Sequence, residues 1–198
     1  MNPLDMVTAL PTGVLAAALT ATVQYAAHLR RRLYIDPATG LANREALARH
    51  VARTRRHAAQ IGLLLMDLDE FKQINDRHGH ETGNQVIRVI ANRLVGVARP
   101  GELVVRLHGD EFVLLLGALP SGATGRRMAR LRADAVAAAI AAPISTSRGE
   151  ITVTGSVGAA ALPVTEADLS GLLTAADDAM YRAKHTRIDR TRSTVSAA

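Results

Sequence analysis

Three carboxylates stand where apolar stretches of the sequence end. Asp67 closes one such stretch, and Asp110 and Glu111 lie between two others. Strand ends and hairpin tips allow a rigid sheet to present side chains toward a shared point. Carboxylates in a chain without cysteine favour a hard cation such as Mg²⁺. A pair of such ions can neutralise a triphosphate and activate a hydroxyl for attack on phosphorus.

These residues also have an ordinary structural explanation, which the residue types alone leave open. Asp is common in turns because its side chain hydrogen-bonds the nearby backbone, so all three acids can equally be solvated turn residues. Gly109 directly precedes the pair Asp110 and Glu111. A glycine there permits either close approach of a bulky ligand to the backbone or simply a tight hairpin turn.

Strands and helices alternate around these positions. Short apolar runs predict strands over 61–66, 103–107, 112–116 and 151–160. The middle two form a hairpin, because glycine and aspartate lie between them. Apolar residues at helical spacing predict helices over 43–51, 86–97, 124–141 and 169–183, with Asn43 as an N-cap and Gly79 and Gly83 as interruptions. This order predicts an α+β, ferredoxin-like fold: a mostly antiparallel central sheet flanked by helices and preceded by an N-terminal helix.

Composition limits the class of protein. The chain has 198 residues, 48% of them hydrophobic, which suffices for one domain with a core and a short appendage. The absence of cysteine excludes disulfides and thiolate metal sites. A net charge of +6 attracts phosphates of any kind. Only 3% of residues are aromatic, and without base-stacking side chains we expect no nucleic-acid partner.

The N-terminal segment 1–32 predicts an apolar helix. Residues 6–29 contain no Asp, Glu, Lys or Arg, and such a helix is long enough to span a bilayer. Arg30, Arg31 and Arg32 follow it directly, which by the positive-inside rule places the following domain in the cytoplasm. We therefore expect a membrane anchor that tethers a cytoplasmic domain to the inner face of the membrane. The alternative is a soluble, alanine-rich helix that packs against a partner copy.

Four ordered segments of the chain resemble the motifs of the GGDEF family of diguanylate cyclases. They are 36–44 (DPATGLANR), 66–76 (MDLDEFKQIND), 106–112 (RLHGDEF) and 176–184 (ADDAMYRAK). Together, in this order and spacing, they are far more specific than any one of them. The chain is accordingly identified as having a GGDEF domain over 33–190 with a variant HGDEF signature, followed by a disordered tail over 191–198.

The resemblance implies the reaction and its metal. Members of the family join two GTP molecules into cyclic di-GMP and release pyrophosphate, with one GTP held by each domain of a homodimer. Two Mg²⁺ or Mn²⁺ ions would be held by the side chains of Asp67, Asp110 and Glu111 and by the carbonyl of Leu68. Asp110 and Glu111 would also activate the attacking 3′-hydroxyl.

The resemblance also implies the substrate contacts. Lys72 and Lys184 would steady the phosphate charge, and Asn75 would bind the guanine edge. The other residues at substrate-binding positions are Asn84, His108, Gly109 and Arg187.

Three ligand-binding positions depart from the family pattern. His108 replaces the first glycine of the signature, where glycine permits a positive φ and leaves room for substrate. Asn84 replaces an aspartate that accepts hydrogen bonds from guanine, so charge assistance is lost. Ile188 occupies the place of a phosphate-binding arginine, with Arg187 one residue away.

A fourth departure concerns the inhibitory product site of the family, RxxD, which here reads Arg99 to Glu102. Glutamate keeps the charge at a longer reach, so we expect this site to be degenerate. The departures leave an alternative to the cyclase: a catalytically weak or inactive GGDEF domain that acts as a GTP-binding or protein-interaction module.

Overall fold

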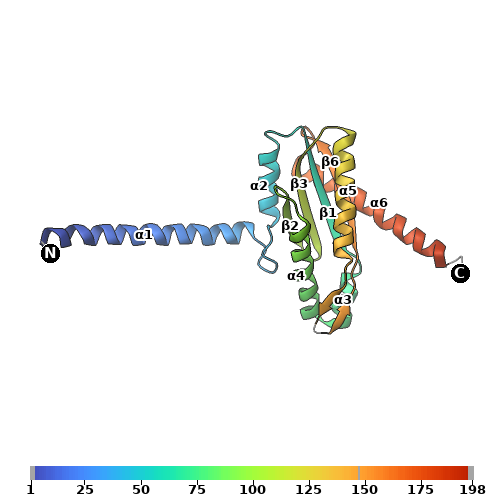
Figure 1. Ribbon diagram of the computed structural model, residues 1–198, viewed down its shortest axis with the longest axis horizontal. Coiled ribbons are helices and arrows are strands. Elements are labelled where there is room, and N and C mark those ends of the chain that lie inside the picture. The colour runs from blue at the N-terminus through green and yellow to red at the C-terminus, as the bar shows by residue number, and fades with distance from the viewer. Residues whose placement is uncertain (1–2, 147, 196–198) are drawn as a thin grey trace.

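The structure, a computed structural model, describes residues 3–146 and 148–195, with side chains described for 13–26, 28–29, 33–146 and 148–184. The elements in chain order are α1 (Pro3–Tyr34), α2 (Arg44–Thr54), β1 (Gln60–Leu68), α3 (Phe71–His78), α4 (His80–Val97), β2 (Leu103–His108), β3 (Glu111–Leu119), α5 (Ala123–Ile140), β4 (Ile144–Thr146), β5 (Gly149–Ile151), β6 (Gly155–Pro163) and α6 (Leu169–Val195). α1 projects from one side of the domain and the end of α6 from the other (Figure 1).

The main sheet has the strand order β2-β3-β1-β6, and every neighbouring pair is antiparallel. β1 therefore lies in the interior of the sheet, and because helices bury both of its faces, its sequence reads as a nearly continuous apolar run. β4 and β5 form a separate two-stranded ribbon. The predicted α+β fold with an antiparallel central sheet is confirmed.

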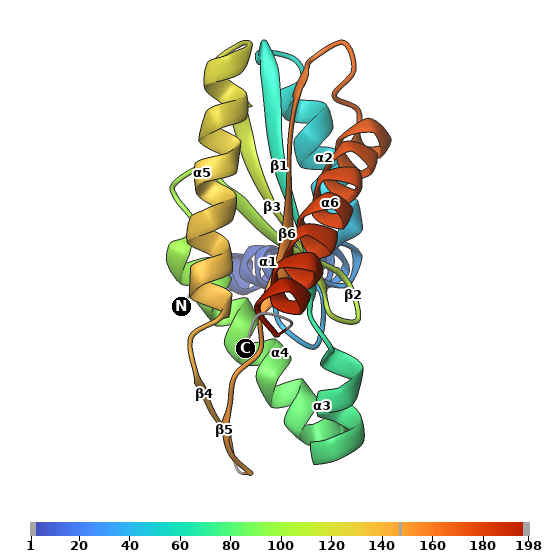
Figure 2. The ribbon, with the colours of Figure 1, turned by 90° about the vertical axis from the view of Figure 1, so that its right-hand side faces the viewer.

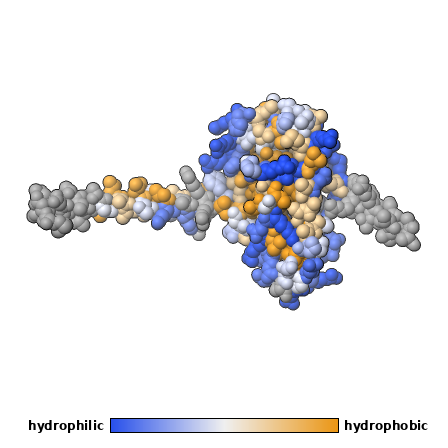
Figure 3. Space-filling model, in the orientation of Figure 1, coloured by the Kyte–Doolittle hydropathy of each residue, from blue (hydrophilic) through white to orange (hydrophobic). Residues whose placement is uncertain are grey.

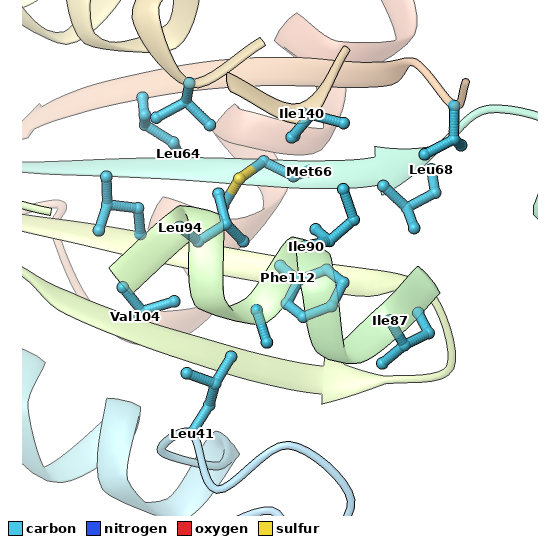
Figure 4. Packing of buried hydrophobic residues seen from close by; sticks show 14 of the residues in the cluster. Leu41, Leu64, Met66, Leu68, Ile87, Ile90, Leu94, Val104, Phe112 and Ile140 are labelled. Atoms are coloured by element: carbon cyan, nitrogen blue, oxygen red, sulfur yellow. The ribbon is translucent and has the colours of Figure 1, made fainter. Parts of the chain in front are cut away.

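Helices cover both faces of this sheet. α4 and α5 pack on one face, and α2 and α6 pack on the other. Figure 2 looks onto the β6 edge, with α5 on one side of it and α6 on the other. Alternate residues of a strand point to opposite faces, so Met66 joins the α4–α5 cluster (Figure 4) and Leu65 joins the α2–α6 cluster. By the same alternation Asp67 faces the α6 side.

Of the local predictions, the N-cap at Asn43 and the helix interruption at Gly79 are confirmed, whereas the interruption at Gly83 is wrong. Asn43 is the predicted N-cap of α2, and its Oδ1 accepts a hydrogen bond from the amide of Ala46 at 3.1 Å. Gly79, with φ of 85°, separates α3 from α4 as predicted. Gly83, however, lies inside α4 and does not interrupt it.

The segment 151–160 was predicted as one strand, and this is wrong. β5 ends at Ile151 and β6 begins at Gly155. Gly155 pairs with Leu68, the last residue of β1, so the regular pairing of β1 with β6 does not extend to 152–154. The chain leaves the sheet here and joins the β4–β5 ribbon, which the sequence did not predict.

The two ends of the chain also differ from expectation. α6 continues to Val195, so 191–195 are helical where a disordered tail was predicted, and 196–198 lie outside the described residues. The membrane anchor predicted over 1–32 is not supported. Within the residues that the structure describes, no helix combines the length and the apolar character that a bilayer crossing requires. α1 has the length, but alanine and threonine supply much of its sequence in place of leucine and isoleucine.

Candidate functional site

The predicted carboxylates meet at one end of the sheet. Asp67 and Glu111 are cross-strand partners in the antiparallel pair β1–β3, and directly opposite residues lie close enough to interact. Asp110 sits in the turn between β2 and β3, immediately before Glu111. Asp67 is distant in the sequence from Asp110 and Glu111, yet all three acids lie in one small region of the structure.

The electrostatics of this region reflect burial first and the crowding of like charges second. Burial raises the pKa of Asp110, and the neighbouring charge of Asp67 raises it further. Burial likewise raises the pKa of Glu111, while nearby His108 lowers it and the charges of Asp67, Asp110 and Asp177 raise it. Unfavourable ionisation of clustered acids is relieved by a cation.

Basic groups already contact two of these acids. Lys184 Nζ lies 2.9 Å from Asp67 Oδ2, and this hydrogen bond raises the pKa of Lys184. His108 Nε2 lies 3.3 Å from Glu111 Oε2. Lys184 comes from α6, which reaches the carboxylates because α6 packs over β6 and β1.

The donor set suits a hard divalent cation, although it is not assembled around one. Carboxylate oxygens from Asp67, Asp110 and Glu111, with the carbonyl of Leu68 at the strand end, are the ligand types that Mg²⁺ prefers. Among the described residues, no three acidic or histidine side chains converge closely enough to form a metal centre. A metal that takes Asp67 Oδ2 or Glu111 Oε2 would compete with Lys184 or His108 for that oxygen.

The loop between β1 and α3 is held by a residue to which the sequence analysis assigned no role. Asp69 accepts hydrogen bonds from Thr154 Oγ1 at 2.6 Å and from Ser156 Oγ at 2.7 Å. Its amide donates to the carbonyl of Thr154 at 2.8 Å. Glu70 follows in the left-handed region with φ of 56°, the single such non-glycine residue in the described part of the chain. The loop therefore has one defined path into α3, whose first turn presents Lys72 to solvent.

Asn75 and Asn84 are brought to the same helix crossing. A Cβ on Gly83 would lie 1.9 Å from Asn75 Oδ1 and 3.3 Å from the ring of Phe71. The absence of a side chain at Gly83 thus lets the Asn75 amide lie against α4, beside the position of Asn84. This is a packing reason for the glycine, which local sequence signals do not reveal.

A cavity of about 740 Å³ opens on the other side of α3. Its walls include Asp69, Gln73 and Arg77 on one side and residues 150–154 on the other, and Lys184 stands at its edge. The amine of Lys184 thus lies between this cavity and the carboxylates.

The family model described as diguanylate cyclase, GGDEF domain, matches residues 33–190. The chain belongs to the GGDEF family. It is 40% identical over 163 residues to the diguanylate cyclase TpbB of Pseudomonas aeruginosa, covering 80% of this chain and 37% of TpbB. It is 39% identical over 166 residues to the diguanylate cyclase DgcP of the same organism, covering 81% of this chain and 24% of DgcP. The chain therefore spans little more than a third of the length of TpbB and about a quarter of the length of DgcP.

A solved structure shares the architecture. The crystal structure of the coiled coil and GGDEF domain of DgcB from Caulobacter crescentus, in complex with c-di-GMP, matches with a TM-score of 0.76. The match covers 90% of this chain and 95% of that chain at 27% identity.

The GGDEF signature of this chain accommodates His108 without backbone conflict. His108 is not among the residues with positive φ, whereas Gly109 has φ of 48°. The backbone at 108 therefore does not require glycine, because 108 is the last residue of strand β2. The His108 side chain is 68% exposed, and its Nε2 lies 3.3 Å from Glu111 Oε2.

The position of the family's inhibitory site is occupied by an internal ion pair. Arg132 Nε and Nη2 donate to the two oxygens of Glu102 at 3.0 and 2.6 Å, and each side chain is only 8% exposed. The amide of Arg99 also donates to Glu102, at 2.8 Å. Glu102 is therefore a buried structural acid, while Arg99 is exposed. Arg187 and Ile188, the remaining predicted positions, lie outside the residues whose side chains are described.

Proposed function

We propose that this chain is a diguanylate cyclase that condenses two GTP molecules into cyclic di-GMP and releases pyrophosphate. The observation that carries the proposal is the placement of Asp67, Asp110 and Glu111 at the same end of the sheet in a chain of the GGDEF family. The crowding of these acids supports a role that requires a cation.

Mg²⁺, or Mn²⁺, fits the donor chemistry, with two ions per site. Asp67, Asp110, Glu111 and the carbonyl of Leu68 would hold them. When bound, the ions supply charge neutralisation to the triphosphate and lower the pKa of the attacking hydroxyl.

The chain's own residues account for binding and proton transfer. Asn75 and Asn84 have amide groups suited to the guanine edge, and Lys72, Lys184 and Arg187 would bind the phosphates. Gly109 leaves the hairpin turn open, since a Cβ there would meet nothing within 4 Å.

Asp110 and Glu111 are suited to accept the proton of the 3′-hydroxyl. Both are carboxylates at the sheet end where the hydroxyl would be held, and a general base must lie within hydrogen-bond reach of the proton that it accepts. The 3′-oxygen of one GTP then attacks the α-phosphorus of the other, and the bond to the β-phosphate oxygen breaks. Pyrophosphate leaves with its charge balanced by Lys184. A second attack in the opposite direction, by the other 3′-oxygen on the remaining α-phosphorus, closes the ring and releases a second pyrophosphate.

Such chemistry needs two domains face to face, and α1 offers a means of pairing two copies. Along the described part of α1, apolar side chains lie exposed to solvent (Figure 3). One seam follows alternating steps of four and three residues: Leu15, Leu19, Thr22, Ala26, Leu29 and Leu33. This is the spacing of a coiled-coil seam. We therefore expect a homodimer joined through α1, as the coiled coil of DgcB also suggests.

A second function is supported by specific residues. Asn84, His108 and Ile188 depart from the family at ligand positions, and two acids are engaged by basic groups. A domain that binds GTP without turnover, or that docks on a partner protein, would tolerate these features.

The deciding experiment incubates the full chain with GTP and Mg²⁺ or Mn²⁺ and measures cyclic di-GMP and pyrophosphate. The double variant Asp110→Ala, Glu111→Ala is the control. We expect product from the parent chain alone. Product from the control would overturn the site assignment, and tight GTP binding without product would establish the second function.

The dimer is tested separately with the double variant Leu19→Lys, Leu29→Lys, which places like charges in the seam. We expect its specific activity to fall steeply on dilution, while the parent chain's activity does not. Equal behaviour of the two chains would reject pairing through α1.

A further inference from the structure

The side chain of Arg106 joins the signature turn to the segment that follows α1. Its Nε and Nη2 donate to the carbonyl of Gly109 at 3.0 and 2.8 Å. Its Nη1 donates to Asp36 Oδ1 at 3.1 Å. The Arg106 side chain is 13% exposed, so the planar guanidinium is held in one orientation by its contacts at both ends.

Asp36 is itself fixed. The same Oδ1 accepts hydrogen bonds from the amide of Thr39 at 2.9 Å and from Thr39 Oγ1 at 2.6 Å. Burial alone would raise the pKa of Asp36, but the hydrogen bonds from Thr39 and Arg106 outweigh it and the pKa is lowered. Asp36 thus stays ionised and orients Arg106.

The segment that follows α1 also hydrogen-bonds to the last turn of α1. The amide of Asn43 donates to the carbonyl of Tyr34 at 3.0 Å, and Asn43 Nδ2 donates to the carbonyl of Leu33 at 3.0 Å. A further hydrogen bond connects this segment to strand β2: the amide of Arg106 donates to the carbonyl of Ala42 at 2.9 Å. A continuous set of hydrogen bonds therefore runs from the last turn of α1 to β2.

The far end of this set is the peptide that precedes the catalytic acid. Gly109 has φ of 48°, and its carbonyl belongs to the peptide bond that continues into Asp110. Rotation of that peptide changes the direction in which Asp110 leaves the turn. The guanidinium of Arg106, donating twice to the carbonyl, prevents the rotation.

We propose that Arg106 is a positioning residue, and that Asp36, Arg106 and Gly109 form a relay that couples the end of α1 to the orientation of Asp110 and Glu111. The proposal rests on the cyclase function proposed above. Pairing of two copies depends on the placement of α1. A change in that placement thereby alters the orientation of the catalytic turn through Asp36, Arg106 and Gly109.

The first test compares Arg106→Lys and Asp36→Asn in the full chain. Lysine keeps the charge but cannot donate twice to one carbonyl while contacting Asp36. Misplacement of a reacting group by about 1 Å costs on the order of 100-fold in rate. We expect kcat to fall roughly 10- to 100-fold in Arg106→Lys and less in Asp36→Asn, with the KM for GTP changed less than about threefold. The double variant should be little worse than Arg106→Lys, because both residues act through one carbonyl.

Arg132→Lys is the matched control. It weakens another buried Arg–carboxylate pair, the one with Glu102, and lies outside the relay. It should lower thermal stability while leaving kcat unchanged. An equal loss of kcat in Arg132→Lys, or full kcat in Arg106→Lys, would overturn the relay.

A second readout is independent of turnover. Hydrogen exchange of the backbone over 107–112 should quicken in Asp36→Asn and stay at the parent rate in Arg132→Lys. Unchanged exchange in Asp36→Asn overturns the relay even where the parent chain makes product. Quickened exchange supports it even where the parent chain makes none, so failure of the relay and failure of the cyclase function are distinguished.

Discussion

Lys184 Nζ and Asp67 Oδ2 lie 2.9 Å apart, although 117 positions separate the two residues in the chain. The amine of Lys184 lies beside Asp67 Oδ2, where a metal ion bound by the Asp67 carboxylate would otherwise lie. Lys184 has two possible partners, Asp67 and the phosphates of GTP, and it can satisfy only one of them fully. On the proposed function, we therefore expect binding of metal and binding of substrate to be coupled through this side chain.

The coupling predicts opposite effects of Lys184→Met on the two ligands. Without GTP, Mn²⁺ should bind several-fold more tightly, because Asp67 is released. The KM for GTP should rise about tenfold, as expected for the loss of one charged phosphate contact. Electron paramagnetic resonance of free Mn²⁺ and steady-state kinetics measure the two effects. Lys72→Met serves as the comparison: it should raise the KM but leave Mn²⁺ binding without GTP unchanged. Equal Mn²⁺ binding by Lys184→Met and the parent chain contradicts the coupling.

His108→Gly should raise turnover. The ring that contacts Glu111 is removed, and His108 is in strand conformation, so glycine brings no relief of backbone strain. We expect a lower Mg²⁺ requirement and a higher kcat, with little change in melting temperature. His108→Ala separates the causes: it removes the ring without adding backbone freedom and should give most of the gain. A gain in glycine alone would assign the effect to flexibility of the turn.

The positions of the acids could be predicted because they depend on local patterns. Apolar runs marked where β1 and β3 lie, and Gly109 with Asp110 marked the turn between β2 and β3. That Asp67 faces Glu111 could not be predicted from these patterns alone. It follows from β1 lying between β3 and β6, which is decided by packing of the whole sheet.

The contacts that the sequence did not reveal are those between distant residues. Arg132 with Glu102, and Arg106 with Asp36, are pairs whose partners come from different elements. Arginine and acid are each compatible with an exposed surface, so their residue types carry no signal of pairing. Gly83 illustrates the same limit, since its role is set by the Asn75 side chain and not by helix propensity.

Gly83→Ala should displace the Asn75 side chain. The added methyl would overlap Oδ1, so either the amide or the crossing of α3 and α4 must shift. Because Oδ1 is the free end of a side chain, its displacement should cost little stability, while GTP affinity should fall if Asn75 binds guanine. Gly96→Ala is the control in the same helix: nothing lies within 4 Å of its added Cβ, and it should stabilise by roughly 0.5–1 kcal/mol. Isothermal titration with GTP and urea unfolding measure both, and unchanged affinity in Gly83→Ala would remove Asn75 from the guanine site.

Asp110→Asn should raise the stability of the metal-free chain near neutral pH. The pKa of Asp110 in the folded chain is raised, mainly by burial, above its ordinary value of 3.8. A raised folded pKa means that stability is fully present below the unfolded pKa and is lost as pH rises through the folded pKa. The advantage of the asparagine variant should therefore be absent in acid, grow as the pH rises past 3.8 and then level off. Urea unfolding at several pH values measures this difference.

The effect of Mg²⁺ on melting temperature provides a second test of the role of Asp110. The ion should raise the melting temperature of the parent chain, because binding to the folded state stabilises it. It should do so much less in Asp110→Asn. A stability difference that is constant from acid to neutral pH would show that the Asp110 carboxylate is not strained by its surroundings.

Glu102→Gln should behave as a structural and not a regulatory variant. Loss of the charge leaves Arg132 buried without its ionic partner, and breaking a buried pair in this way costs about 3 kcal/mol. Arg99→Ala is the matched surface change and should leave stability within about 0.5 kcal/mol. In cyclase assays with added cyclic di-GMP, both variants and the parent chain should respond alike, because the acid is already bound within the protein. Inhibition of the parent chain that disappears in Arg99→Ala would show instead that product binds at this position despite the ion pair.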